Sequence, residues 1–401
     1  MNFKIPFIGR AHKYTKEEQD IVIEAMNSAI PLTQGKYQQA FEEKFSDYIG
    51  ADYSFAINNA TAGLELSAQM CQFKEGDEFI CPSHTFTASA YPFIKKGGTP
   101  VWADIDIETR VVNLETIKRC VTQKTKAIVV VHLYGLIIPE IKQIANFCKE
   151  NNILLIEDVA QAMGTEIDGK KAGTFGDFGV FSFHSHKNMT TLGEGGMLVV
   201  QDKKYADIIP MLRHNGHCGW EFERANYWIP AMGNVDLPKL DGEFLMPNNY
   251  CLGEVECALG IKLLDRIDII NNQKRNRAIK FIDELSEYRL LEFHREDSIR
   301  HNYHLLVAEV KDAKRDIFMK KMSEEKSIQC VVQYYPLNRY DFYKKLGFDN
   351  ANCPNTDKVF NNMVSFPFHH MMSDEDFEYI LKSTKEVLSL MENGEWRIEK
   401  R

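Results

Sequence analysis

The sequence has no paired cysteine motif and no excess of positive charge. Its nine cysteines are an odd number, and no two of them form a C-x-x-C pair, so neither a zinc site nor a disulfide framework is suggested. The net charge of −9 argues against a nucleic-acid-binding protein, because the phosphate backbone is held by clustered Lys and Arg. One local basic pocket would still suffice for an anionic small molecule. A reducing cytoplasm is the expected location.

Long apolar runs are also missing. The longest, at 127–131 and 153–156, are far too short to span a bilayer, and residues 1–10 lack the apolar stretch of a secretory signal. Hydrophobic residues make up 44% of the 401 positions and charged residues 26%. This composition is typical of a soluble globular protein with two or three domains and no membrane segment.

Short apolar runs alternate with helical patterns from about residue 53 to residue 200. The runs lie at 53–57, 78–81, 100–103, 127–131, 153–156, 179–183 and 197–200. Strands that alternate with helices predict an α/β fold, in which helices cover both faces of a mostly parallel central sheet. In such sheets the ligand site lies at the carboxyl ends of the strands.

The rest of the chain has a different pattern. Residues 218–246 form a long loop rich in aromatic residues, Gly and Pro, and loops of this length are often functional lids or disordered. Residues 252–276 predict one long helix, and from about 277 the order is helix, strands and helices. We therefore expect a large domain over 1–270 and a smaller C-terminal α+β domain over 271–401.

Two segments are expected to bring a carboxylate and a lysine to the carboxyl ends of the predicted strands. Asp158 ends one apolar run, and Lys187 follows another and precedes the glycines at 193, 195 and 196. Taken singly, Asp158 could cap a helix and Lys187 could be a solvated surface residue. Together they suit pyridoxal 5′-phosphate (PLP), because a lysine amine forms a Schiff base with an aldehyde and a carboxylate holds a pyridinium nitrogen.

A candidate phosphate cradle lies earlier in the chain. Residues 58–63 follow the strand at 53–57 and open the helix predicted over 64–73. Helix N-termini offer free N–H groups and the positive end of a dipole to phosphate. Thr61 could also cap this helix, which is compatible with a phosphate role.

The combined motifs carry a family resemblance. Glu157-Asp158-Val-Ala-Gln161, Phe181-Ser182-Phe-x-x-x-Lys187 and Gly193-Glu-Gly-Gly196 stand in the order and spacing of the DegT/StrS family of sugar aminotransferases, which the sequence resembles from about residue 5 to 390. The resemblance implies the fold-type-I aminotransferase fold. It also implies PLP as cofactor, with pyridoxamine 5′-phosphate (PMP) as the intermediate form.

The resemblance also implies a role for each matching residue. Lys187 would form the Schiff base and then move a proton as a neutral amine, and Asp158 would keep the pyridine nitrogen protonated. Gln161 would lie near the phenolic oxygen of the cofactor, and Phe86 would stack on its ring. The phosphate would be bound by Thr61, the backbone of Ala62 and Ser182.

One further cofactor contact is expected from a neighbouring subunit. In this family an asparagine reaches across a dimer interface to the phosphate, and the best match here is Asn249, with Asn248 as the alternative. The resemblance therefore implies a homodimer with shared active sites. The sequence departs from the family at Cys251, Glu256 and Leu136, positions that concern the substrate and the interface rather than the cofactor chemistry.

The expected reaction moves an amino group from an amino acid, L-glutamate by family resemblance, to a nucleotide-linked keto-sugar in a ping-pong mechanism. A smaller keto compound without a nucleotide is an alternative acceptor. A PLP- or PMP-dependent sugar dehydratase would carry histidine in place of Lys187, and a non-catalytic sensor would have lost Lys187 or Asp158. An amino sugar for a polysaccharide is a typical product of the family.

Histidines and tyrosines near these motifs are candidates for substrate contact. A metal site at His184 and His186 is not expected, because residues i and i+2 of an extended chain point to opposite faces. The same reasoning leaves one of the two histidines as a substrate contact. Tyr334 or Tyr335 is a further candidate, and the other histidines of interest, at 214, 217, 369 and 370, are structural or substrate-facing.

Overall fold

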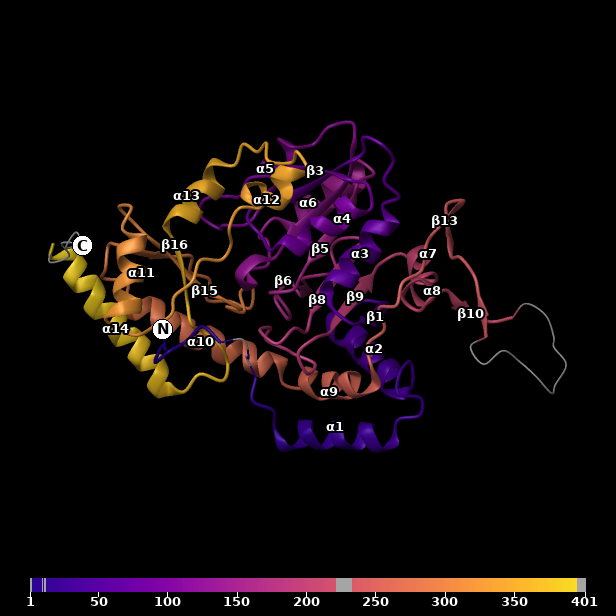
Figure 1. Cartoon of the computed structure of the whole chain (residues 1–401), viewed down its shortest axis with the longest axis horizontal. Helices are drawn as coiled ribbons and strands as arrows, with labels where there is room; N and C mark the ends of the chain where they lie inside the picture. The colour runs from indigo at the N-terminus through magenta and orange to yellow at the C-terminus, as the bar shows by residue number, and fades with distance from the viewer. Residues whose placement is uncertain (1, 9, 11, 221–232, 395–401) are drawn as a thin grey trace.

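The computed structural model describes residues 2–8, 10, 12–220 and 233–394 (Figure 1). In this part, seven strands form the central sheet in the order β1 (Tyr53–Ile57), β9 (Gly196–Val200), β8 (Phe178–Ser182), β5 (Leu154–Asp158), β4 (Thr125–Val131), β2 (Glu78–Pro82) and β3 (Thr99–Ala103). Neighbouring strands are parallel except at β9, which runs antiparallel to β1 and β8. The prediction of a mostly parallel sheet is confirmed.

The reversal at β9 follows from the connection before it. Residues 183–195 join β8 to its neighbour β9 without the crossover helix that parallel strands need. The sequence pattern predicts the strand at 197–200 but does not indicate whether it runs parallel or antiparallel to its neighbours. This connection carries Lys187, and it starts at the carboxyl end of β8.

Helices cover both faces of the sheet, as predicted. On β4, Ile128 and Val130 pack into one apolar cluster and Ala127 and Val129 into the other, as expected for a strand that is buried on both sides. The first cluster includes residues of α1 (Lys16–Ser28), α2 (Lys36–Ile49), α5 (Leu114–Lys118), α6 (Ile141–Glu150) and α9 (Glu254–Leu264). The second includes residues of α3 (Ala60–Met70), α4 (Tyr91–Lys95), α7 (Lys203–Ala206) and α8 (Ile209–Arg213).

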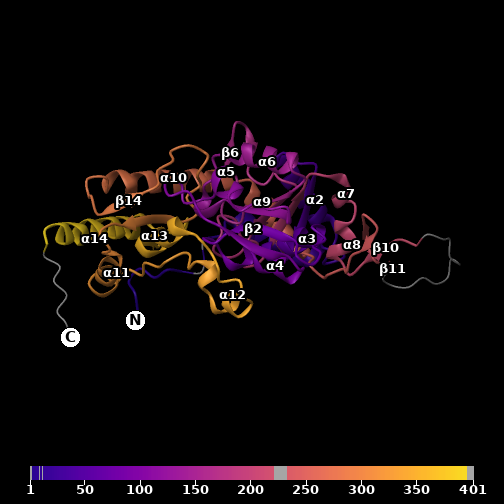
Figure 2. The ribbon, with the colours of Figure 1, turned by 90° about the horizontal axis from the view of Figure 1, so that it is seen from above.

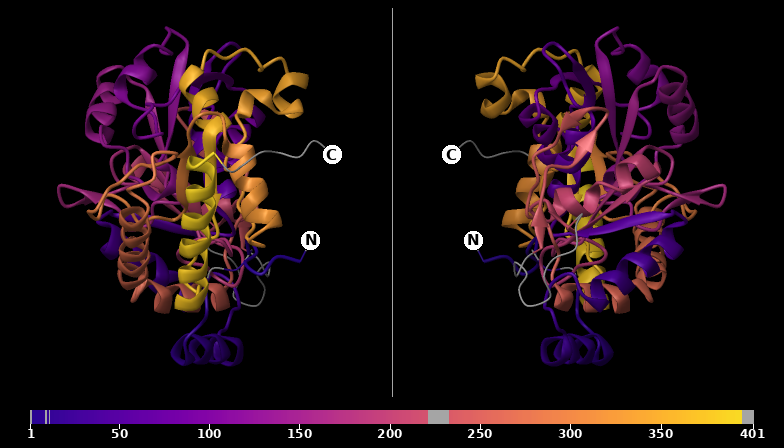
Figure 3. Two further views of the ribbon diagram at one scale, coloured as in Figure 1. Left: turned by 90° about the vertical axis from the view of Figure 1, so that its left-hand side faces the viewer. Right: turned by 90° about the vertical axis from the view of Figure 1, so that its right-hand side faces the viewer.

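A second, antiparallel sheet lies in the C-terminal part. Its strands are β14 (Leu291–Phe293), β15 (Leu306–Val310) and β16 (Met363–Phe366), in that order. They share an apolar cluster with α10 (Ile267–Glu284), α11 (Arg315–Glu324) and α14 (Asp374–Glu392). Seen end-on in Figure 3, α14 lies in front with α10 and α11 on either side. The division at residue 270 remains a prediction, since α10 gives Ile267 to the first cluster and Phe281 to this one.

Parts of the C-terminal half reach back over the large sheet. The connection between β15 and β16 contains α12 (Asp341–Lys345) and α13 (Pro354–Asn362). Tyr343 of α12 packs into the cluster of α3, and the backbone N–H of Asn355 donates to Asp104 at 2.9 Å. Figure 2 shows α12 at the lower edge of the molecule in that view. The connection between β15 and β16 also includes residues 333 and 334 and places them near the carboxyl ends of β5 and β8.

The prediction of one helix over 252–276 is wrong. The structure has α9 and α10 there, with a break at Asp265 and Arg266. Both residues are held by tertiary ion pairs, Asp265 by Lys44 and Arg266 by Glu18. The apolar pattern continues across the break because both helices bury residues around it, so periodicity alone could not place it.

The segment predicted as one long loop, 218–246, contains short strands among its described residues. β10 (His217–Cys218) pairs antiparallel with β11 (Asn234–Val235), and β12 (Lys239–Leu240) pairs antiparallel with β13 (Glu243–Phe244). Residues 221–232 lie outside the described part. A further short antiparallel pair joins β6 (Glu166–Ile167) to β7 (Lys170–Lys171). None of the described helices has the length and apolar character that a membrane span needs.

Candidate active site

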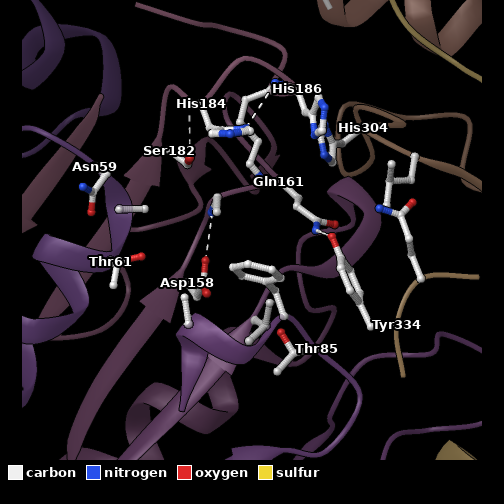
Figure 4. A pocket seen from close by; sticks show the side chains of 18 of the residues that line it. Asn59, Thr61, Thr85, Asp158, Gln161, Ser182, His184, His186, His304 and Tyr334 are labelled. Carbon is white, nitrogen blue, oxygen red and sulfur yellow. Dashed lines mark hydrogen bonds between the residues drawn. The ribbon is translucent and has the colours of Figure 1, made fainter. Parts of the chain in front are cut away.

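A cavity of about 550 Å³ opens at the carboxyl ends of β5 and β8. Its walls come from the large sheet, from the first turn of α3 and from C-terminal residues at 304–305, 333–334 and 367–369. Its size lies within the usual range for small-molecule sites. Figure 4 shows Asp158, Gln161, Ser182 and Thr61 around it. The expectation that the ligand site lies at this sheet edge agrees with the position of the cavity.

Asp158 is the last residue of β5, and its side chain is buried at the cavity wall. One carboxylate oxygen accepts the hydroxyl proton of Ser89 at 2.7 Å, and the other accepts the backbone N–H of Ala160 at 3.0 Å. No helix begins in the described residues 159–167, so Asp158 does not cap one. The two hydrogen bonds fix the carboxylate in place as an acceptor facing the cavity.

Lys187 lines the same cavity from the connection between β8 and β9. Its backbone is fixed at both ends, since its N–H donates to His184 O at 2.8 Å and its carbonyl accepts from His12 Nε2 at 3.1 Å. Burial lowers the pKa of Lys187 from 10.5 to about 8, although the Asp158 carboxylate acts in the opposite direction. Lys187 is therefore not a solvated surface residue, and a minority of its amine is neutral near physiological pH, far more than for a lysine with the ordinary pKa of 10.5.

The first turn of α3 forms another side of the cavity. The helix begins at Ala60, earlier than predicted, and Asn59 rather than Thr61 caps it, because the Asn59 side chain accepts the Ala62 N–H at 2.9 Å. Thr61 and Ser182 line the cavity. Ala62 is buried and is absent from the described lining, so its phosphate role remains a prediction. Asn is a favoured N-cap residue, and that preference could have identified Asn59.

Two glycines allow α3 to approach the sheet closely. A Cβ atom on Gly196 of β9 would lie 2.9 Å from the backbone nitrogen of Ala60, and one on Gly63 would lie 2.7 Å from Ile57 Cδ1. Real Cβ contacts are longer than this. The glycines therefore set how near the helix N-terminus lies to the ends of β8 and β9.

Gln161 connects the sheet edge to the C-terminal wall. Its Oε1 accepts the backbone N–H of Tyr134 at 2.7 Å, so its Nε2 is the donor to the hydroxyl of Tyr334 at 2.8 Å. Tyr334 lines the cavity, whereas the ring of Tyr335 packs against Tyr340 and Phe360. Of the two tyrosines left open by the sequence, Tyr334 is the one placed at the site.

Phe86 and Asn249 occupy very different positions. Phe86 lines the cavity with 55% of its surface exposed, and its ring centroid lies 6.0 Å from that of Tyr334. Asn249 is exposed, forms an isolated antiparallel β-bridge with His214 and is not part of the described cavity lining. Asn248 also lies outside the lining, and its side chain donates to Gln69 at 3.4 Å. The predicted stacking by Phe86 and the predicted phosphate contact by Asn249 remain predictions.

The argument that His184 and His186 point to opposite faces is wrong. The chain turns after His184, the His186 N–H donates to His184 Nδ1 at 3.4 Å, and the two ring centroids lie 5.0 Å apart. Both residues line the cavity. No group of His, Cys, Asp and Glu among the described residues could hold a metal ion. His304, which the sequence patterns did not single out, lines the cavity together with His369.

Comparison with known proteins shows to which family this chain belongs. The sequence profile of the DegT/DnrJ/EryC1/StrS aminotransferase family matches residues 12–385. The chain belongs to this family. As a DegT/DnrJ/EryC1/StrS protein it is an aminotransferase, and the recognition made from the motifs is confirmed.

Relatives match along almost their whole length. GDP-perosamine synthase of Escherichia coli O157:H7 is 31% identical over 376 residues, which cover 94% of this chain and 96% of the relative. The spore coat polysaccharide biosynthesis protein SpsC of Bacillus subtilis is 29% identical over 96% of each chain. Spr1654 from Streptococcus pneumoniae, in its PMP form, has a TM-score of 0.83 at 26% identity and covers 96% of this chain and 99% of that one. The fold-type-I prediction is confirmed.

The residues of the site fit the cofactor of this family, PLP, and Spr1654 has also been solved in a PLP form. The cavity offers a primary amine with a lowered pKa, on Lys187, and a fixed buried carboxylate, on Asp158. The hydroxyls of Thr61 and Ser182 lie beside the N-terminus of an 11-residue helix, where phosphate binds well. Amine, carboxylate and phosphate site are the three features that PLP needs.

Proposed function

We propose that this enzyme transfers an amino group from L-glutamate to the ketone of a nucleotide-linked sugar by a ping-pong mechanism. The observation that carries the proposal is the placement of Lys187 and Asp158 in one cavity, with the lysine amine partly neutral. GDP-perosamine synthase and SpsC, which are named for a GDP-linked sugar and for a polysaccharide, support a sugar acceptor. The product would be an amino sugar for a polysaccharide.

The side chains of this chain divide the work among them. When bound, PLP supplies an aldehyde carbon that exchanges one amine for another and a ring that withdraws electrons. Asp158 would hold a proton on the pyridine nitrogen, because its carboxylate is fixed by Ser89 and Ala160. Lys187 would take the proton from the substrate carbon and return it, since a neutral amine is the competent base.

The remaining contacts would orient the cofactor and the substrates. Thr61 and Ser182 would bind the phosphate, with Ala62 contributing its backbone. Phe86 would stack on the ring, since it presents an exposed aromatic face inside the cavity. Gln161 would donate its second amide N–H to the phenolic oxygen, because its first goes to Tyr334 and its Oε1 is already occupied.

We also propose that the working enzyme is a cytoplasmic homodimer. Asn249 is exposed and is not part of the described cavity lining of its own chain, which suits a side chain that contacts a second subunit. It would bind the cofactor phosphate in the partner's site. The active site would then be complete only in the dimer.

The test is an absorption spectrum of the purified protein with PLP, followed by addition of L-glutamate. Wild-type protein should form a yellow band that glutamate bleaches, and Lys187→Ala should form neither the band nor the bleaching. Lys203→Ala removes an exposed lysine that pairs with Asp207, and it serves as the control. The bleached enzyme is then mixed with nucleotide-linked keto-sugars. Failure to form the band would exclude the aminotransferase chemistry, and a band that glutamate leaves unchanged would exclude glutamate as the donor.

A further inference from the structure

His304 lies two residues before β15, and its buried ring forms part of the cavity wall opposite the sheet edge. Figure 4 shows it beside His186. Its Nδ1 lies 3.4 Å from Asn188 Oδ1, and Asn188 directly follows Lys187. Its Nε2 has no hydrogen-bond partner among the described residues, and it is not among the buried unsatisfied atoms. The Nε2 atom is therefore open to the cavity.

A chain of hydrogen bonds decides which nitrogen of His304 carries the proton. The carbonyl oxygen of Met163 can only accept, so the amide group 2.9 Å away is Asn271 Nδ2, and Asn271 presents its oxygen to the next residue. That oxygen accepts from Asn188 Nδ2 at 2.9 Å. Asn188 therefore presents Oδ1 to His304, and an oxygen acceptor requires a proton on His304 Nδ1.

The contacts of Lys274 agree with this assignment. This buried lysine donates to Asn188 Oδ1 at 2.9 Å and to the carbonyl of His304 at 2.9 Å. Burial lowers the pKa of Lys274 to about 7, and both its charged and its neutral form carry enough N–H groups for these two bonds. Burial, together with the charges of Lys187 and Lys274, holds the pKa of His304 well below its usual range. The ring is thus neutral, with a proton on Nδ1 and a lone pair on Nε2.

We propose that His304 is a specificity-determining residue of the acceptor subsite, where its Nε2 lone pair accepts a hydrogen bond from a hydroxyl group of the sugar. Asn188 and Lys274 are positioning residues, because they hold the ring in this tautomer. The proposal rests on the function proposed above and names how one substrate is recognised.

The two substrates differ in what they offer to such a lone pair. A sugar carries hydroxyl groups, which donate hydrogen bonds. The two carboxylates of glutamate, on its side chain and its α-carbon, are ionised at neutral pH and then offer acceptor oxygens but no hydrogen-bond donor. A fixed lone pair attracts the first and repels the second. His304 should therefore assist the half-reaction with the keto-sugar and contribute little to the half-reaction with glutamate.

The tautomer can be read directly from ¹⁵N NMR of the full-length protein labelled at histidine, with His304→Phe used to assign the signals. We expect His304 to show a protonated Nδ1 and an unprotonated Nε2 from about pH 6 to about pH 9. In this range ordinary histidines lose their charge and exchange between the two neutral tautomers. An Nε2–H tautomer, or a ring that becomes doubly protonated in this range, would overturn the proposal. This measurement requires neither cofactor nor substrate.

The recognition itself is tested by measuring the two half-reactions separately. His304→Phe keeps an aromatic ring but removes the lone pair, and it should lower kcat/KM for the keto-sugar about 10-fold, the value of one hydrogen bond. The rate with glutamate should change less than about twofold. His304→Gln retains an acceptor at a similar reach, and it should lose less. His294→Phe makes the same change at a histidine outside the cavity lining and serves as the control.

The outcomes separate the two proposals. Equal losses in both half-reactions would mean that His304 is merely structural, and a normal keto-sugar rate in His304→Phe would exclude the contact. A panel of keto-sugars that each lack one hydroxyl should contain one member for which wild type and His304→Phe are equal. If wild-type enzyme reacts with glutamate but with no keto-sugar, the acceptor class is wrong, and the NMR result still decides the tautomer.

Discussion

At the scale of single residues, the site depends on an amine that is buried close to one carboxylate. Burial disfavours the charged form of Lys187, and Asp158 favours it. The pKa falls to about 8, so desolvation is the larger of the two effects. The family resemblance implies that Lys187 acts as a neutral amine, which a lowered pKa favours. The structure supplies the physical cause, which is enclosure by the cavity wall rather than a neighbouring positive charge.

The pH dependence of cofactor capture should report this pKa. Only the neutral amine reacts with an aldehyde, so the rate at which the cofactor-free enzyme forms its yellow band should rise with pH and level off above about 8. A stopped-flow series across pH measures the midpoint. Asp158→Asn removes the carboxylate that favours the charged amine and should move the midpoint to lower pH. A wild-type midpoint near the ordinary value of 10.5 would contradict the burial argument.

Other residues of the site owe their orientation to partners distant in sequence. Gln161 is fixed by Tyr134 and Tyr334, and the latter lies 173 positions away. The acidic partner of the motif, Glu157, does not face the cavity. It is fully buried and accepts the N–H groups of Gly173, Phe175 and Gly176. Adjacent carboxylates thus have different roles because successive side chains of β5 point to opposite faces.

At the scale of elements, the close approach of α3 to the sheet edge is the feature that would build the proposed phosphate site. The helix has buried residues along most of its length, and Gly63 lets it pack against Ile57 and Val180. Gly196 of β9 lies against its first turn. A helix N-terminus can bind phosphate only where its N–H groups reach the cavity, so the glycines are as necessary as the hydroxyls.

Substitution of Gly196 by Ala should therefore affect both stability and cofactor affinity. The added Cβ would lie 2.7 Å from the carbonyl of Phe181 and 2.9 Å from the nitrogen of Ala60, both backbone atoms. We expect a loss of about 1–3 kcal/mol in the free energy of unfolding, measured in urea, with weaker PLP binding. Gly219→Ala is the matched control, since no atom of the described residues lies within 4 Å of its Cβ position. Equal stability of the two variants would show that α3 can move away from β9.

At the scale of the whole molecule, the cavity joins the two apolar clusters of the large sheet to the cluster of the C-terminal sheet. Lys274 of α10 contacts Asn188 on one side and His304 on the other. Arg110 makes a similar link, since it pairs with Glu309 of β15 and is buried. The substrate-facing wall is therefore tied to the catalytic connection by buried polar bonds, which are costly to break.

The proposed dimer should be detectable by complementation between two defective subunits. Asn249→Ala should weaken PLP binding, because a charged phosphate loses one donor, and Lys187→Ala abolishes activity. Co-expression of the two variants should restore sites with wild-type PLP affinity, about a quarter of the total if subunits mix at random. Activity at limiting PLP measures this fraction. If the mixture is no more active than Asn249→Ala alone, Asn249 acts in its own chain or has no role at the phosphate.

The sequence by itself determined the strands of the large sheet and placed Asp158 and Lys187 at the edge where the cavity lies. Alternating apolar runs and helical patterns are local signals, and the order of Asp158, Lys187 and the glycine cluster is specific to one family. These features do not depend on contacts between distant residues. The same reasoning could not place the break between α9 and α10, because the ion pairs at Asp265 and Arg266 come from residues more than 200 positions away.

Tertiary structure alone decided which further side chains line the cavity and how they are oriented. It selected Tyr334 over Tyr335, brought His184 and His186 together and added His304, whose tautomer depends on Asn188, Asn271 and Lys274. The directions of these hydrogen bonds and the burial of these side chains are fixed only when the large sheet and the C-terminal sheet pack together. Their physical origin is the requirement that buried polar groups find partners, and those partners lie far apart in the chain.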